Sequence, residues 1–202
     1  MSNRILMSVL ALLGASVPAA AQQFTYDSGA LPAQSVWTDG VEVADVDGDG
    51  DLDILFANGQ GYGSGGARPQ HYFRNDGSGV FTEAHAALNV ANFNAKMVIA
   101  EDFDNDGDLD LMYAPEGPAT TPTQKPRMLI NQGGDQGGTE GVFADESATR
   151  LPNINMASYC VAAGDVDDDG DLDVVFTDGA TFGGIARQAR LYTNDGAGNF
   201  SD

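Results

Sequence analysis

Three nonapeptides place acidic residues at alternate positions. They read DVDGDGDLD at 45–53, DFDNDGDLD at 102–110 and DVDDDGDLD at 165–173. Carboxylates at this density repel one another, which raises their pKa values and costs stability unless something offsets the charge. A hard cation does so, because Ca²⁺ takes about six to eight oxygen ligands and tolerates irregular geometry. The shared spacing D-x-[DN]-x-D-G-D-L-D therefore predicts three Ca²⁺-binding loops.

Five positions of each nonapeptide carry the predicted ligands. Positions 1, 3, 5 and 9 supply side-chain oxygens, and position 7 supplies its backbone carbonyl, as in comparable calcium loops. The side-chain ligands are Asp45, Asp47, Asp49 and Asp53; Asp102, Asp104, Asp106 and Asp110; and Asp165, Asp167, Asp169 and Asp173. The carbonyl ligands are Asp51, Asp108 and Asp171. Glycine at position 6 permits a sharp turn, and the leucine at position 8 (Leu52, Leu109, Leu172) is expected to point inward.

An EF-hand, a magnesium site and a zinc site each fit the acidic loops less well. An EF-hand needs a glutamate at position 12 and helices on both sides, but position 12 is Phe56, Tyr113 or Phe176 and the flanks resemble strands. Mg²⁺ retains its waters and rarely accepts this many protein ligands. Zn²⁺ prefers Cys and His, and the histidines are only His71 and His85. A solvated turn remains as the alternative, and three copies in register argue against it.

The loops belong to a longer internal repeat. Their starts are 57 and 63 residues apart, and marker phenylalanines recur at Phe24, Phe81, Phe143 and Phe200. Alternating or apolar segments lie before and after each loop, and a third segment (HYFRN, RMLIN, RLYTN) leads through a Gly-containing turn to a fourth. These patterns predict four antiparallel strands per unit and no helix after the leader. We place the loop-bearing repeats at approximately 33–89, 90–152 and 153–202 within an all-β region of β-propeller blades.

The motifs resemble FG-GAP/VCBS repeats, the bacterial relatives of the blades in integrin α-subunit propellers. The resemblance is carried by the three acidic loops and by the Asn-Asp-Gly-x-Gly-x-Phe segments at 75–81 and 194–200. The second repeat departs from the pattern, with Asn131-Gln132-Gly133-Gly134 and extra residues before Phe143. The resemblance implies a β-propeller with Ca²⁺ in loops on one face, and roles in adhesion, ligand binding or scaffolding.

About three blades are fewer than the roughly four to eight of known propellers. Two interpretations stay open. Further blades of a longer chain complete the ring, or a second chain does so by strand exchange at the N-terminal segment.

The first 21 residues predict an export signal. Arg4 precedes an apolar stretch at 5–15, and Pro18 is followed by three alanines typical of a cleavage site. We therefore expect a mature chain 22–202 that is secreted, periplasmic or displayed at the cell surface. Its net charge, −21 for the full sequence, argues against binding nucleic acid or anionic membrane. Cys160 is the only cysteine, so no internal disulfide can form, and its alignment with Met97 predicts a buried position.

Basic residues are few and concentrate between the second and third strands of the repeats. They are Arg68, Lys125, Arg127, Arg187 and Arg190, with Tyr62 and Phe182 in the same segments. Two interpretations of them stay open: a basic and aromatic patch for an acidic glycan or a protein partner, or neutralisation of nearby aspartates. No nucleophile or zinc-protease motif is present, so we expect a binding module and not an enzyme. The alternative is the propeller portion of a larger exported enzyme that acts on polysaccharide or another extracellular substrate.

Overall fold

The computed structural model describes residues 29–61, 66–117, 123–179 and 187–202. The predicted signal segment, the marker Phe24 and the aromatic residues Tyr62 and Phe182 lie outside these ranges. Among the described residues, none forms a helix long and apolar enough to cross a membrane.

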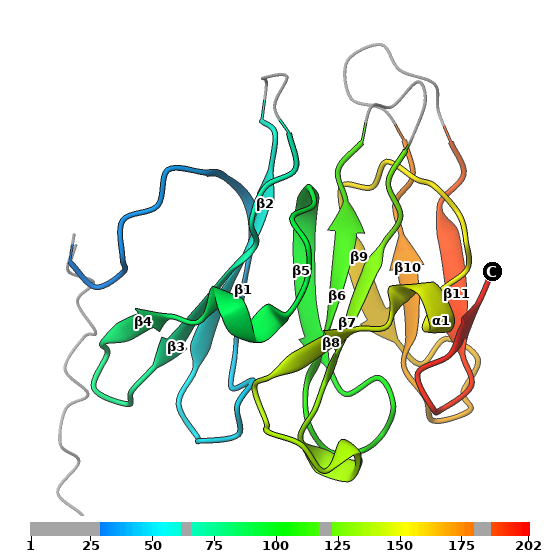
Figure 1. The fold of residues 1–202 in the computed structure, drawn as a ribbon. Helices are drawn as coiled ribbons and strands as arrows, with labels where there is room; N and C mark the ends of the chain where they lie inside the picture. Colours follow the sequence, from blue (N-terminus) through cyan, green and yellow to red (C-terminus); the bar gives the residue numbers. More distant parts are fainter. Residues whose placement is uncertain (1–28, 62–65, 118–122, 180–186) are drawn as a thin grey trace, which may run out of the picture.

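Three four-stranded antiparallel sheets make up the fold, as the repeat pattern predicts (Figure 1). The strand orders are β1-β2-β3-β4, β5-β6-β7-β8 and β12-β11-β10-β9, so each sheet is a simple meander. The first sheet comprises β1 (Trp37–Ala44), β2 (Asp53–Gly59), β3 (His71–Asn75) and β4 (Phe81–Glu83). The second comprises β5 (Ala95–Glu101), β6 (Asp110–Pro115), β7 (Arg127–Asn131) and β8 (Phe143–Asp145). The third comprises β9 (Val161–Gly164), β10 (Asp173–Phe176), β11 (Arg190–Asn194) and β12 (Phe200–Ser201). This all-β arrangement is that of partial propeller blades.

Short helical turns follow the fourth strands, contrary to the prediction of no helix. They are η1 (His85–Leu88) after β4 and α1 (Ser147–Arg150) after β8, and η2 (Gly134–Gln136) lies in the extra residues of the second repeat. In α1, the Ser147 hydroxyl lies 2.5 Å from Asp145 Oδ1, and Arg150 N donates to Glu146 O at 3.0 Å. Turns of four residues are too short to show the apolar periodicity by which helices are recognised in sequence.

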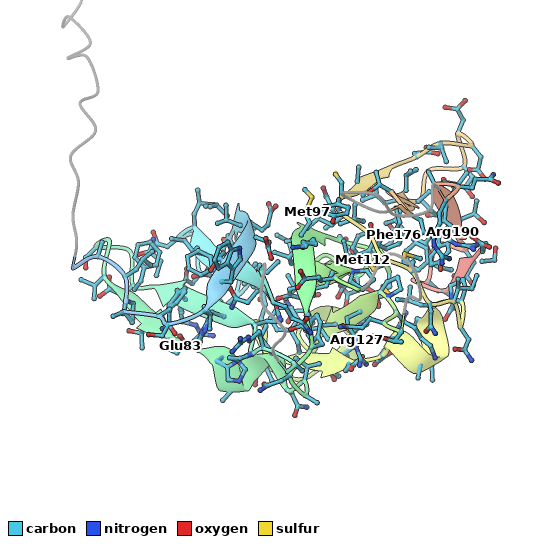
Figure 2. All side chains as sticks on the ribbon, turned by 90° about the horizontal axis from the view of Figure 1, so that it is seen from above. Glu83, Met97, Met112, Arg127, Phe176 and Arg190 are labelled. Atoms are coloured by element: carbon cyan, nitrogen blue, oxygen red, sulfur yellow. The ribbon has the colours of Figure 1, made fainter. Side chains whose placement is uncertain are left out.

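Two apolar cores lie between the three sheets. The first, which includes Leu55, Tyr72 and Leu111, fills the space between the first and second sheets. The second lies between the second and third sheets, where Figure 2 shows Met97, Met112 and Phe176 close together. The sheet faces are therefore held together by apolar side chains from both sides, as the dense apolar strands predicted. All six residues of β6, the second strand of the middle sheet, are buried.

Two expectations about single residues are wrong for the same reason. Leu109 and Leu172 pack against the core that separates their sheet from the preceding one, but Leu52 is 56% exposed because the described residues place no sheet before the first. Met97 packs against the core that faces the third sheet, whereas its equivalent Cys160 is exposed because no described sheet follows the third.

Polar contacts also join the sheets at equivalent positions. Asn131 Nδ2 donates to Val46 O at 3.0 Å, and Asn194 Nδ2 donates to Phe103 O at 2.8 Å. Each bond links the end of the third strand in one sheet to the acidic loop of the preceding sheet. Because these asparagines are buried, loss of either bond would leave unpaired polar groups inside the interface.

Candidate metal centre

The three acidic loops connect the first and second strands of their sheets and lie on one side of the molecule (Figure 1). In each loop, carboxylate oxygens of positions 1, 3 and 9 come within 4.8 Å of one another. The triads are Asp45, Asp47 and Asp53; Asp102, Asp104 and Asp110; and Asp165, Asp167 and Asp173. Nine of the twelve predicted side-chain ligands thus converge, in three groups that could each hold a metal ion.

Backbone conformation forces the loop to turn back on itself. The glycines at position 6 have φ of 94° at Gly50 and 99° at both Gly107 and Gly170, a region that side chains disfavour. Position 4 is also left-handed, with φ of 68° at Gly48, 61° at Asn105 and 62° at Asp168. This role of position 4 was not predicted from the sequence, although Gly, Asn and Asp are the residues that adopt the left-handed conformation most readily.

The aspartate at position 1 holds the tip of its loop. Its carboxylate accepts a hydrogen bond from the backbone of the position 6 glycine, at 2.9 Å between Asp45 and Gly50. In the other two loops, Gly107 N donates to Asp102 and Gly170 N donates to Asp165, both at 3.0 Å. Each bond curls the loop around the carboxylates that would face a cation.

The aspartate at position 9 ties its loop to the sheet. Asp110 Oδ1 accepts from Asn131 N at 2.8 Å, and Oδ2 accepts from Phe103 N at 3.3 Å. The equivalent Asp53 and Asp173 each accept two backbone bonds in the same way, from Asn75 and Val46 and from Asn194 and Val166. All three aspartates are buried. This position is therefore both a candidate ligand and a structural clamp.

Positions 5 and 7 lie outside the triads. The position 5 carboxylates accept the backbone N–H of position 7, at 3.0 Å for Asp49, 3.1 Å for Asp106 and 3.0 Å for Asp169. The second carboxylate oxygens at position 5 remain candidates for coordination. The carbonyl ligands at Asp51, Asp108 and Asp171 remain a prediction.

Several buried carboxylate oxygens in the loops have no hydrogen-bond partner among the described residues. They include Oδ1 of Asp45, Asp47 and Asp104, Oδ2 of Asp106, and both oxygens of Asp108. Unpaired buried carboxylate oxygens are costly, and a cation is the partner that this donor set suits. The all-oxygen composition fits a hard cation such as Ca²⁺ better than Zn²⁺.

The packed carboxylates show raised pKa values, as expected from their spacing. Burial, together with the neighbouring Asp104 and Asp108, raises the pKa of Asp110 to about 8. Burial and the adjacent Asp106 raise the pKa of Asp108 to about 7. Burial likewise raises the pKa of Asp47, Asp53 and Asp104. A bound cation would stabilise the charged form of these carboxylates, and so would offset both the cost of their burial and the repulsion between them.

Two arginines that were not singled out from the sequence partly neutralise the loops. Arg74 Nε lies 2.6 Å from Asp47 Oδ2, and Arg150 Nη2 lies 3.4 Å from Asp104 Oδ2. Each arginine belongs to a third strand or to the turn after a fourth strand and is distant in sequence from its partner, so no local pattern identifies it. Each arginine contacts the aspartate at position 3 of a loop, so its positive charge partly neutralises a candidate metal ligand.

Three of the five residues of the predicted basic patch fall into two groups. Arg127 and Arg190 are the first residues of β7 and β11, and so do not lie in the segments before the third strands as predicted. Arg127 pairs with Asp145 at 2.9 Å and Arg190 with Asp202 at 2.7 Å, which fits neutralisation of local aspartates. Lys125 and Arg127 also line a cavity of about 620 Å³ at the end of the second sheet opposite its acidic loop. Five side-chain amides share this lining: Gln60, Asn92, Asn94, Gln124 and Asn153.

The two histidines join none of the carboxylate triads found among the described residues. His71 Nδ1 lies 2.9 Å from Glu83 Oε2, and His85 Nδ1 lies 2.6 Å from the Gln70 carbonyl oxygen. Their rings are 6.1 Å apart. Both rings thus serve local packing and hydrogen bonding around β3.

Comparison with known families bears directly on the loop-bearing region. Residues 45–113 match the family model described as FG-GAP-like repeat. Residues 45–113 therefore contain an FG-GAP-like repeat. The match begins at the first acidic loop and ends within β6, after the second loop, and it covers about a third of the chain. Comparison with curated proteins gives no match. The third loop lies outside the residues that match the FG-GAP-like repeat but forms the same triad.

Proposed function

We propose that this chain is an exported, Ca²⁺-stabilised β-propeller repeat module that binds a ligand and is not itself an enzyme. The observation that carries the metal part is the recurrence of one carboxylate triad in three successive sheets. The unpaired oxygens of Asp45, Asp47 and Asp104 support it, because each belongs to a triad and would gain a partner from a cation. The FG-GAP-like repeat supports the binding role, and the leader-like residues 1–21 support export to a compartment where Ca²⁺ is plentiful.

Calorimetric titration with CaCl₂ tests the metal part of the proposal. We expect about three Ca²⁺ per chain, with dissociation constants on the order of 10⁻⁴–10⁻³ M or somewhat tighter. Titration with MgCl₂ is the control and should give much weaker heats, because Mg²⁺ retains its waters. Saturation at fewer than one Ca²⁺ per chain would contradict the proposal.

The cavity beside Lys125 and Arg127 is where we propose that the ligand binds. Arg127 is held in place, because its guanidinium packs over the Phe93 ring at 5.7 Å and pairs with Asp145. Lys125 is exposed at the rim. Amides and two cations around one cavity suit a polar, anionic ligand, and an acidic glycan meets this description.

Binding of an oligogalacturonate probe tests this site. Lys125→Ala should weaken binding by about tenfold, since it removes a charged hydrogen-bond donor from the rim. Lys125→Arg is the matched variant and should retain most of the affinity. The assay needs a Ca²⁺-saturated protein and a buffer of constant ionic strength. Equal affinity of the wild type and Lys125→Ala would remove the cavity from the proposal and leave the metal loops untouched.

A further inference from the structure

Each sheet has two faces that pack against neighbouring sheets, and we define them by equivalent positions. The leading face packs against the preceding sheet, and the trailing face packs against the following one. In the second and third sheets the leading positions are Val98, Ala100 and Leu109, and Val161, Ala163 and Leu172. All six contribute to the cores between the sheets.

The same leading positions of the first sheet are open. They are Val41, Val43 and Leu52, which are between 50% and 56% exposed. Their side chains are as apolar as their buried equivalents. The leading face of the first sheet is therefore an interface without a described partner.

The trailing positions are buried in the first and second sheets and exposed in the third. Val46, Leu55 and Tyr72 of the first sheet and Phe103, Met112 and Met128 of the second are buried in the two cores. Their equivalents in the third sheet are Val166, Val175 and Leu191, which are between 39% and 53% exposed. The third sheet thus presents a free trailing face, and the first presents a free leading face.

One hydrogen bond recurs between adjacent sheets, and the residues equivalent to its donor and its acceptor lie on the two free faces. Asn131 and Asn194 each donate to a carbonyl of the preceding sheet, at Val46 and Phe103 respectively, and to a carbonyl of their own loop. Within the described residues, Nδ2 of the equivalent Asn75 donates to its own loop, at 3.0 Å to Leu52 O, and to no carbonyl of another sheet. The equivalent acceptor is Val166 O, on the trailing face of the third sheet.

Charged and aromatic side chains continue the match at the inner strands. Asp39, Lys96 and Tyr159 occupy one position in the three repeats. Lys96 Nζ lies 3.1 Å from Asp39 Oδ2 and 5.9 Å from the centre of the Tyr159 ring, so residues at this position meet from sheet to sheet. A further sheet of the first type would bring another Asp39 next to Tyr159.

We propose that the trailing face of the third sheet docks on the leading face of the first sheet of a second copy of this chain. The two faces together offer the contacts that already join the sheets within one copy. Both carry apolar side chains, the leading face carries the asparagine donor, and the trailing face carries the carbonyl acceptor. Two copies joined head to tail at both ends make six sheets, which lies within the range of about four to eight blades in known propellers. Contacts of this kind close into a ring when the rotation between copies permits. The inference rests on the fold and not on the proposed metal binding.

Sedimentation equilibrium of the purified chain in Ca²⁺-containing buffer tests the docking. The wild type should sediment as a dimer. Val43→Asp on the leading face and Leu191→Asp on the trailing face should each give monomers, because a charge would be buried at both interfaces of the ring. Both residues are exposed within one copy, so each variant should keep the folded circular dichroism spectrum of the wild type. Val80→Asp is the matched control: Val80 is 57% exposed in the β3–β4 turn, away from both faces, and its dimer should persist.

Mixing the two monomeric variants separates head-to-tail docking from other modes. The trailing face of Val43→Asp and the leading face of Leu191→Asp are both intact, so an equal mixture should recover dimers through one good interface. If instead two leading faces or two trailing faces docked on each other, one of the two variants would still form dimers by itself. A wild type that remains monomeric at its highest soluble concentration, a mixture no heavier than its components, or open-ended larger species would each overturn the proposal.

Discussion

Removal of Ca²⁺ with EDTA is expected to lower the thermal unfolding midpoint of the chain by about 15–30 °C. A ligand at about 100 times its dissociation constant stabilises the folded state by about 2.7 kcal/mol per site. Three equivalent triads would then contribute about 8 kcal/mol. For a domain of this size, about 1 kcal/mol shifts the midpoint by roughly 2–4 °C. Differential scanning calorimetry in EDTA and in excess CaCl₂ measures the shift.

Ionic strength must be matched in this experiment. The chain has a formal net charge of −21, so any salt screens repulsion in the folded state to some degree. A control in NaCl at the same ionic strength measures that screening, and a control in MgCl₂ measures the effect of divalent charge alone. A midpoint that rises equally in NaCl and CaCl₂ would contradict specific binding in the acidic loops.

Replacement of the aspartate at position 9 should have a larger effect than replacement at any other position of a loop, and Asp110 represents this position in the middle sheet. Asp110→Ala removes the acceptor of two buried N–H groups, those of Asn131 and Phe103. Leaving both unpaired costs about 2–5 kcal/mol in the absence of metal. The loss of one metal site removes about 2.7 kcal/mol more in excess Ca²⁺. Chemical denaturation in EDTA and in CaCl₂ measures the two contributions separately.

Asp110→Asn separates the clamp from the ligand. Its amide oxygen can still accept from Asn131 N, so the metal-free variant should be more stable than Asp110→Ala. The stabilisation by Ca²⁺ should nevertheless fall by about one third, because a carboxylate ligand is lost. Asp135→Ala is the matched control, since it removes one exposed carboxylate of the same repeat outside the triads. A full Ca²⁺ response in Asp110→Asn would exclude this carboxylate as a ligand.

The pH dependence of the metal-free wild type should follow from the same residue. Burial raises the pKa of folded Asp110 to about 8, whereas an unfolded aspartate has its ordinary value near 4. Between these values the folded state binds more protons, so the free energy of unfolding should increase as the pH falls from 8 towards 4. Asp110→Asn should reduce this dependence, and the remainder should come from the other loop aspartates whose pKa is raised, such as Asp108. The response to Ca²⁺ should change in the opposite direction, because protons compete with the cation for the carboxylates.

The local chemistry of this protein could be predicted without its three-dimensional structure. The spacing D-x-[DN]-x-D-G-D-L-D predicted that the aspartates of one nonapeptide lie close together, and those at positions 1, 3 and 9 do so, whereas position 5 lies outside the triads. The glycine at position 6 predicted a sharp turn, and its positive φ agrees. The third strands were located from their segments alone, and β3, β7 and β11 begin and end at the predicted residues. These features depend on neighbours in the chain, so a repeated local pattern is sufficient to show them.

The contacts between repeats could be determined only from the arrangement of the sheets in space. Leu52 and Leu109 occupy one motif position, yet one is exposed and the other packs on a core, because only the second has a described sheet before it. The pairing of Arg150 with Asp104 and the bond from Asn131 to Val46 join residues 46 and 85 positions apart, where local spacing carries no information. The physical reason is that a repeat specifies its own sheet by local turns and alternation, whereas burial of its two faces depends on the sheets that lie beside it.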